Sequence, residues 1–120
     1  MLESQGCEWL VEAHGCEPER LRSRPALESL FAALRSDLDL HPVAVEEWFS
    51  FPGPGGWTGV QLLAESHLAC HTFPEYGSMC LNLFCCRPRK EWDFTGYLER
   101  AFGARRVKVR RLDRAYKETA

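Results

Sequence analysis

The sequence lacks the features that mark membrane-spanning, secreted or nucleic-acid-binding proteins. None of its 120 residues belong to an apolar run long enough to cross a membrane. The first residues, Met1-Leu2-Glu3-Ser4, carry neither the basic start nor the apolar stretch of a secretory signal. A formal net charge of −2 produces no overall field toward nucleic acid or a lipid surface. We therefore expect a cytoplasmic protein with no nucleic-acid or membrane partner.

Metal-binding spacing is also lacking, although the chain has six cysteines. No two of them form the C-x-x-C pair of a structural zinc site, and cytosolic thiols are normally reduced. His67 and His71 would share one face of a strand with Cys86 near them, but zinc ligands on a strand usually lie two residues apart. We expect no metal. Adjacent Cys85 and Cys86 would point to opposite faces of a strand, so at most one of them faces any given site.

The chain has no nucleophile elbow of a serine hydrolase. Ser66 stands between Glu65 and His67 with no flanking glycines and no following helix, so the G-x-S-x-G pattern is missing. From composition alone, the simplest interpretation is that these side chains are polar members of a half-exposed strand. The basic segment at residues 100–117 is interpreted in the same way, as a solvated strand and tail, with an anion or partner site as the alternative.

Apolar periodicity indicates six strands and two helices. A period of 3.6 residues predicts helices, and alternation or short apolar runs predict strands. The polar stretch around Ser66 follows the preceding strand without a clear turn and counts as a strand of its own. The expected helices are residues 19–38 and 92–102, and the other expected strands are residues 7–14, 43–51, 57–64, 79–86 and 107–112.

This order, β-α-β-β-β-β-α-β, predicts a single α+β domain over residues 1–120. Neighbouring strands joined by short turns favour a mainly antiparallel sheet, and both helices are expected on one face as a two-layer sandwich. The other face would then remain uncovered. Since an exposed apolar sheet face promotes association, we expect two copies to pair through it.

One stretch resembles a known family. Glu65-Ser66-His67, followed by His71-Thr72-Phe73-Pro74-Glu75, is similar to the E-S-H-x-x-x-H-T-W-P-E run of the prokaryotic S-adenosylmethionine decarboxylase proenzymes. A family strand ending F-T-C-G corresponds to Phe84-Cys85-Cys86-Arg87. The similarity extends over most of the chain, from the first strand to the closing helix and strand.

The resemblance implies that the protein makes its own cofactor. The chain would be cut between Glu65 and Ser66, giving a β chain of residues 1–65 and an α chain of residues 66–120. Ser66 would become a pyruvoyl group that forms a Schiff base with an amine substrate and acts as an electron sink. His71 matches the acid and base of processing, and Thr58 matches a family serine that assists it. Cys86 matches the proton donor, and homodimers are expected.

The residues on the substrate side differ more from the family pattern. Glu75 matches a substrate-binding position, Phe73 replaces a tryptophan and could stack on adenine, and either Phe49 or Phe51 would face the substrate. Asn82 stands where the family has an aspartate. The leading hypothesis is decarboxylation of S-adenosylmethionine for polyamine (spermidine) synthesis. The alternatives are decarboxylation of a basic amino acid, ornithine or arginine, and a non-catalytic partner subunit.

Overall fold

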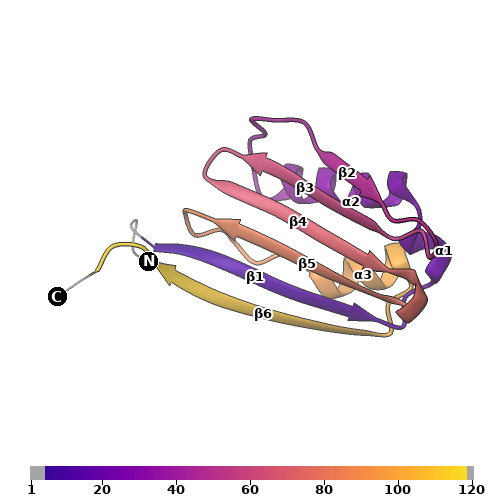
Figure 1. Ribbon diagram of the computed structural model, residues 1–120. Helices are drawn as coiled ribbons and strands as arrows, with labels where there is room; N and C mark the ends of the chain where they lie inside the picture. Colours follow the sequence, from indigo (N-terminus) through magenta and orange to yellow (C-terminus); the bar gives the residue numbers. More distant parts are fainter. Residues whose placement is uncertain (1–4, 119–120) are drawn as a thin grey trace.

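The computed structural model describes residues 5–118, which form one antiparallel sheet with helices along one side (Figure 1). Residues 1–4 and 119–120 lie outside the described part. The expectation that the chain has no secretory signal rests on residues 1–4, so it also lies outside the described residues. The elements are β1 (Gln5–His14), α1 (Pro18–Leu21), α2 (Arg24–Asp37), β2 (Glu47–Ser50), β3 (Trp57–Leu63), β4 (Ser66–Phe73), the short 3-10 helix η1 (Pro74–Tyr76), β5 (Ser78–Cys85), α3 (Phe94–Phe102) and β6 (Arg106–Ala115).

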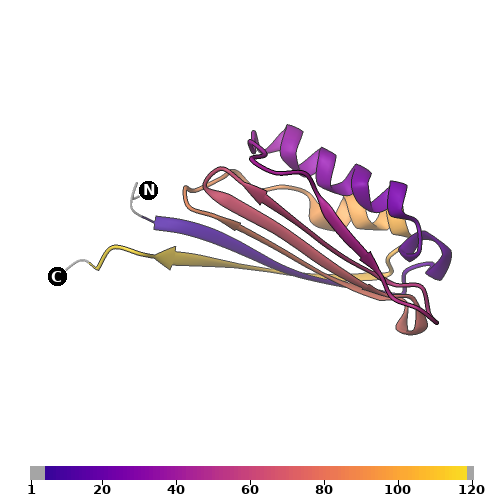
Figure 2. The same cartoon turned by 45° about the horizontal axis from the view of Figure 1, so that its top comes forward.

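The six strands of the described region lie in the order β2-β3-β4-β5-β1-β6, and every neighbouring pair is antiparallel. Strand β1 therefore lies between β5 and β6, although these two strands are near the other end of the chain. In Figure 2, α2 and α3 lie on the same side of the sheet, and no α-helix of residues 5–118 covers the opposite side. The predicted two-layer α+β architecture with helices on one face is confirmed.

The core lies between the sheet and the helices, as the two periodicities require. On β1, alternate side chains from Cys7 to Ala13 are buried against the helices. The apolar stripe of α2 faces them and consists of Leu27, Leu30, Phe31 and Leu34, each with no exposed surface.

The first predicted helix is in fact two helices. The helical conformation is interrupted after α1. Ser23 then caps the start of α2 by accepting a hydrogen bond from the backbone amide of Ala26 at 3.2 Å. Pro25 lies in the first turn of α2, where its missing amide costs nothing. The sequence spacing suggested one helix because the apolar positions continue across the break, whereas the capping serine was not recognised.

The strand predicted at residues 43–51 is also too long, since β2 begins only at Glu47. Val43 and Val45 are 60% and 82% exposed and do not pack on the sheet. This segment is held instead by the hydrogen bond from Val43 N to Leu62 O at 3.3 Å and by the Gln61 side-chain amide, which donates to Ala44 O at 3.1 Å. Alternating valines alone did not distinguish these loop contacts from a strand.

The open face of the sheet exposes apolar side chains from three strands. Phe49, Val60, Leu62 and Leu112 are between 43% and 59% exposed there. An apolar surface of this kind is typical of an interaction site. Pairing of two copies through this face stays a prediction. No helix within residues 5–118 has both the length and the apolar character needed to span a membrane.

Candidate active site

The peptide between Glu65 and Ser66 lies in a tight hairpin turn that the sequence did not predict. Leu63 pairs with Ser66, so Ala64 and Glu65 alone connect β3 to β4. Glu65 has a φ of 62°, in the left-handed region that is unfavourable for a residue with a side chain. Such a conformation costs roughly 1–2 kcal/mol. The turn was missed because neither residue is a glycine or asparagine, the residues that usually adopt this conformation.

The carbonyl group of this peptide is polarised by the neighbouring strand end. The Cys86 amide donates to Glu65 O at 2.6 Å, a short hydrogen bond that draws electron density from the carbonyl carbon. A backbone amide in this position stabilises an oxyanion if the carbon is attacked. Strain and polarisation therefore coincide at one peptide bond.

Ser66 is the first residue of β4 and is 6% exposed, with its Oγ 3.4 Å from Ala64 O. It lines a cavity of about 490 Å³ together with Cys86. The other lining residues are Glu8, Leu62, Leu63, Glu65, His67, Phe84 and Arg114. The structure thus brings Ser66, Glu65 and Cys86 together in one hollow at the end of the sheet.

The two adjacent cysteines have different surroundings. Cys85 has no exposed surface, and burial raises the pKa of its thiol to about 12. Cys86 follows at the end of β5 and faces the cavity. The expectation that at most one of the two faces a site is confirmed, and Cys86 is the one.

His71 does not approach Ser66 within one protomer. The two residues are five positions apart on β4, a separation of about 17 Å at the rise of an extended strand. They also point to opposite faces, since Ser66 is buried on the helix side and His71 is exposed on the open side. His71 Nδ1 and Thr58 Oγ1 lie 2.9 Å apart across β3 and β4. The structure therefore joins Thr58 to His71, but joins neither to the Glu65–Ser66 peptide of its own chain.

The three residues expected on the substrate side lie together, also far from Ser66. Phe51, Phe73 and Glu75 line one cavity of about 260 Å³ with Pro52, Pro54, Gly56 and Thr72. Phe49 packs edge-on against Phe51 with ring centroids 5.1 Å apart, and of these two rings Phe51 is the one that lines the cavity. Two aromatic walls and one carboxylate suit a flat, polar ligand such as a nucleoside.

A charged network beside Ser66 was not predicted. Glu8 accepts a hydrogen bond from Asn82 Nδ2 at 2.7 Å and forms an ion pair with Arg114. Burial opposes the ionisation of Glu8, but the hydrogen bonds from Asn82 and Arg114 outweigh it and keep the pKa of this carboxyl below its usual value. His67 stacks on Phe84 next to this network, with ring centroids 5.5 Å apart. No local signal in the sequence connects Glu8 to Arg114, a residue 106 positions away.

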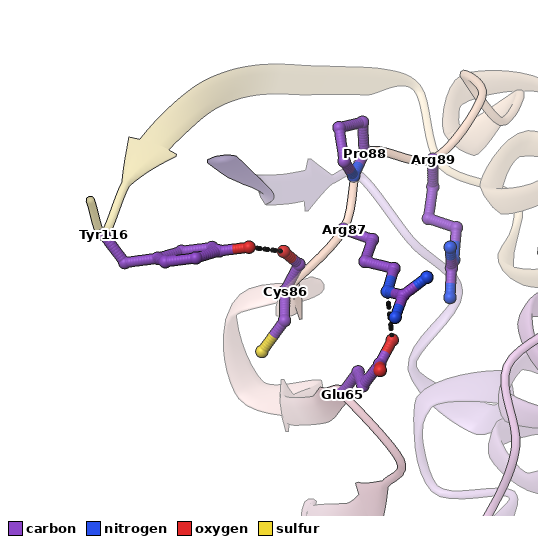
Figure 3. A pocket seen from close by; sticks show the side chains of 6 residues that line it. All are labelled: Glu65, Cys86, Arg87, Pro88, Arg89 and Tyr116. Carbon is purple, nitrogen blue, oxygen red and sulfur yellow. Dashed lines mark hydrogen bonds and ion pairs between the residues drawn. The ribbon is translucent and has the colours of Figure 1, made fainter. Parts of the chain in front are cut away.

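A third cavity, of about 540 Å³, shares Glu65 and Cys86 with the cavity that contains Ser66 (Figure 3). The loop after β5 forms one wall with Arg87, Pro88 and Arg89. Arg87 Nε lies 2.8 Å from Glu65 Oε2. Within the described residues, no cluster of three or more His, Cys, Asp or Glu is arranged to hold a metal ion.

Comparison with known proteins gives a consistent result. Residues 7–115 match the family model described as S-adenosylmethionine decarboxylase. The S-adenosylmethionine decarboxylase proenzyme of Syntrophomonas wolfei is 32% identical over 120 residues, covering 98% of this chain and 92% of the relative. That of Clostridium kluyveri is 31% identical over 108 residues, covering 88% and 82%. The crystal structure of the adenosylmethionine decarboxylase from Aquifex aeolicus is similar over 99% of this chain and 98% of that one, with a TM-score of 0.80 at 22% identity.

Proposed function

The chain belongs to the S-adenosylmethionine decarboxylase family, and from this premise we propose that it is a self-processing, pyruvoyl-dependent decarboxylase of S-adenosylmethionine. Its product would supply aminopropyl groups for polyamine synthesis, including spermidine. The observation that carries the proposal is the Glu65–Ser66 peptide, which is strained at Glu65, polarised by the Cys86 amide and located at the cavity that contains Cys86.

The geometry supports processing by the serine itself. Attack of Ser66 Oγ on the Glu65 carbonyl carbon closes a five-membered ring, and breaking the C–N bond leaves an ester and a free amine. Loss of the Ser66 α-proton then breaks the Cβ–O bond, which releases Glu65 as a carboxylate. The remaining dehydroalanine becomes an imine, and water converts it to a ketone with release of ammonia. The left-handed φ of Glu65 raises the energy of the intact peptide, which is the reactant of the first step.

The residues around Ser66 fit the group that this reaction produces. A pyruvoyl group supplies a carbonyl that binds the substrate amine and accepts the electron pair freed by decarboxylation. Cys86 lines the same cavity, where its thiol can give a proton to the substrate carbon. Leu62, Leu63 and Phe84 contribute apolar side chains to the lining of this cavity.

The position of His71 supports a homodimer in which this residue acts on the partner chain. General acid and base catalysis requires contact at about 3 Å, whereas His71 is about 17 Å from Ser66 along its own strand. Its ring is exposed on the open sheet face, next to the apolar side chains that a second copy would cover. A two-fold axis between Leu68 and Ala69, midway between residues 66 and 71, would bring each His71 opposite the other chain's Glu65–Ser66 turn, which lines the cavity that contains Cys86.

The same symmetry would complete the substrate site. The cavity lined by Phe51, Phe73 and Glu75 lies beyond His71 on β4 and would move with it toward the partner's Ser66. The reacting carbonyl would then come from one chain and the aromatic walls for adenine from the other. This division explains why the candidate residues form two groups within a single protomer.

Measuring carbon dioxide release from S-adenosylmethionine, ornithine and arginine side by side tests this proposal against its alternatives. We expect processed protein to release carbon dioxide from S-adenosylmethionine and not from ornithine or arginine, because two aromatic walls suit adenine better than an alkyl ammonium chain. Release only from a basic amino acid would replace the proposed substrate. Complete self-cleavage without release from any of the three would favour a non-catalytic partner subunit.

A further inference from the structure

We propose that Arg87 and Arg89 form a carboxylate-binding site for the new C-terminus that cleavage creates at Glu65. This inference rests on the proposed self-processing, and adds a role for two residues that the reaction itself does not use. The ligand is the α-carboxylate of the β chain, and the site is the 540 Å³ cavity of Figure 3.

The first argument is position. The Cys86 amide holds the Glu65 carbonyl oxygen at 2.6 Å, so the carbon that becomes the carboxylate lies against the start of the loop that carries both arginines. Figure 3 shows both arginine side chains extending from this loop toward the side on which Glu65 lies. Pro88 between them limits the backbone freedom of the loop. Tyr116 Oη donates to Cys86 O at 3.1 Å and fixes the loop from the side of β6.

The second argument is charge. Before cleavage the cavity wall carries two guanidinium groups and one carboxylate, that of the Glu65 side chain. Arg87 is paired with this carboxylate at 2.8 Å, whereas Arg89 has no ion pair within the described residues. Cleavage converts the neutral Glu65 amide into one further carboxylate. The wall then holds two positive and two negative groups and is balanced.

The third argument is an unsatisfied donor. Arg89 Nε is buried and makes no hydrogen bond to any group within residues 5–118. A buried donor without a partner is rare and unfavourable. A guanidinium offers two parallel N–H groups to a carboxylate, so the new C-terminus is the kind of ligand that satisfies it. The unsatisfied Arg89 Nε is thus explained if the position of Arg89 suits the cleaved product, with its new carboxylate, better than the intact precursor.

Accessibility of the new C-terminus to a carboxypeptidase tests the assignment. Processed protein is treated with the protease, and removal of Glu65 and then Ala64 is followed by the mass of the β chain. The C-terminus of the α chain in the same sample is an internal reference for protease activity. The rate of trimming reports the fraction of molecules in which the new C-terminus is released from its site.

We expect Arg89→Gln to be trimmed at least about tenfold faster than the unaltered protein, because a charge-assisted contact is lost. Arg87→Gln should show a smaller increase, since the Arg87–Glu65 pair is 66% and 47% exposed. Lys90→Gln is the matched control: it removes one positive charge from the same loop at an exposed position outside the cavity, and should leave trimming unchanged. If Arg89→Gln does not fold by thermal melting, Arg89→Lys takes its place, and trimming faster than in the unaltered protein is again expected.

Equal trimming of the unaltered protein and the Arg89 variant would overturn this inference alone. Loss of cleavage in that variant would also overturn it, because Arg89 would then act before the carboxylate exists. An unaltered protein that stays intact would overturn the proposed function and this inference together.

Discussion

Complementation between two inactive variants tests whether His71 acts across a dimer. His71→Ala removes the proposed processing group but keeps Ser66, and Ser66→Ala keeps His71 but cannot be cleaved. Each variant alone should remain intact. In a mixed dimer, the Ser66→Ala chain provides His71 to the Ser66 of its partner, so the His71→Ala chain should be cut between residues 65 and 66.

The expected yield follows from symmetry. If equal amounts of the two chains are co-expressed and pair at random, about half of the His71→Ala chains lie in mixed dimers. About half of them should therefore be cleaved, and the Ser66→Ala chains should remain whole. A small tag on one chain separates the two populations in an intact mass spectrum. A double variant, Ser66→Ala with His71→Ala, is the control partner and should rescue nothing.

The opposite result would refute the structural reasoning. The separation of about 17 Å along β4 excludes direct contact between His71 and Ser66 of one chain at the roughly 3 Å that proton transfer requires. If His71→Ala chains remain intact in mixed dimers, or if His71→Ala is cleaved alone at the normal rate, His71 does not act on the partner's peptide. A protein that is monomeric by analytical ultracentrifugation while it processes would refute the dimer itself.

Three further outcomes follow from single contacts. Thr58→Val should slow processing by up to about tenfold, measured as cleaved fraction against time, because it removes the 2.9 Å contact with His71, and Thr58→Ser should retain the normal rate. Cys86→Ala should still be cleaved but lose about 10²–10⁴-fold in carbon dioxide release, whereas Cys85→Ala, a change in the core, should retain turnover if folded. Burial raises the pKa of Cys70 from 9.0 to about 12, so above pH 9 the unfolded chain loses this proton before the folded one. The free energy of unfolding should therefore fall as pH rises above 9, and Cys70→Ala should weaken this slope in urea titrations; an unchanged slope would contradict it.

The sequence predicted the features that depend on local periodicity. The alternation from Cys7 to Ala13 and the helical spacing from Leu27 to Leu34 correspond to the faces that are buried. Burial of the apolar side chains selects one face of each strand and helix. The covered face and the open face of the sheet could therefore be predicted from the spacing of apolar residues. The same pattern could not show that Val43 and Val45 are exposed, because loop hydrogen bonds replace strand pairing there.

The site was predictable only in part, because its geometry depends on contacts between distant segments. The resemblance supplied Glu65, Ser66 and Cys86, and the structure places all three at one cavity. It could not supply the φ of Glu65, which belongs to the hairpin turn between β3 and β4. It also could not supply the hydrogen bond from the Cys86 amide, which depends on the pairing of β4 with β5. The ion pair between Glu8 and Arg114 could not be predicted either, since it depends on β1 lying beside β6.

The mass spectrum of the purified, unaltered protein tests the central claim most directly. The account predicts two chains that meet between Glu65 and Ser66, with the α chain lighter than a serine-initiated fragment by the difference between serine and pyruvoyl, the mass of one ammonia. Ser66→Ala should give a single intact chain under the same conditions. An unaltered protein that remains intact after long incubation, or a Ser66→Ala protein that is cleaved at this peptide, would contradict the account.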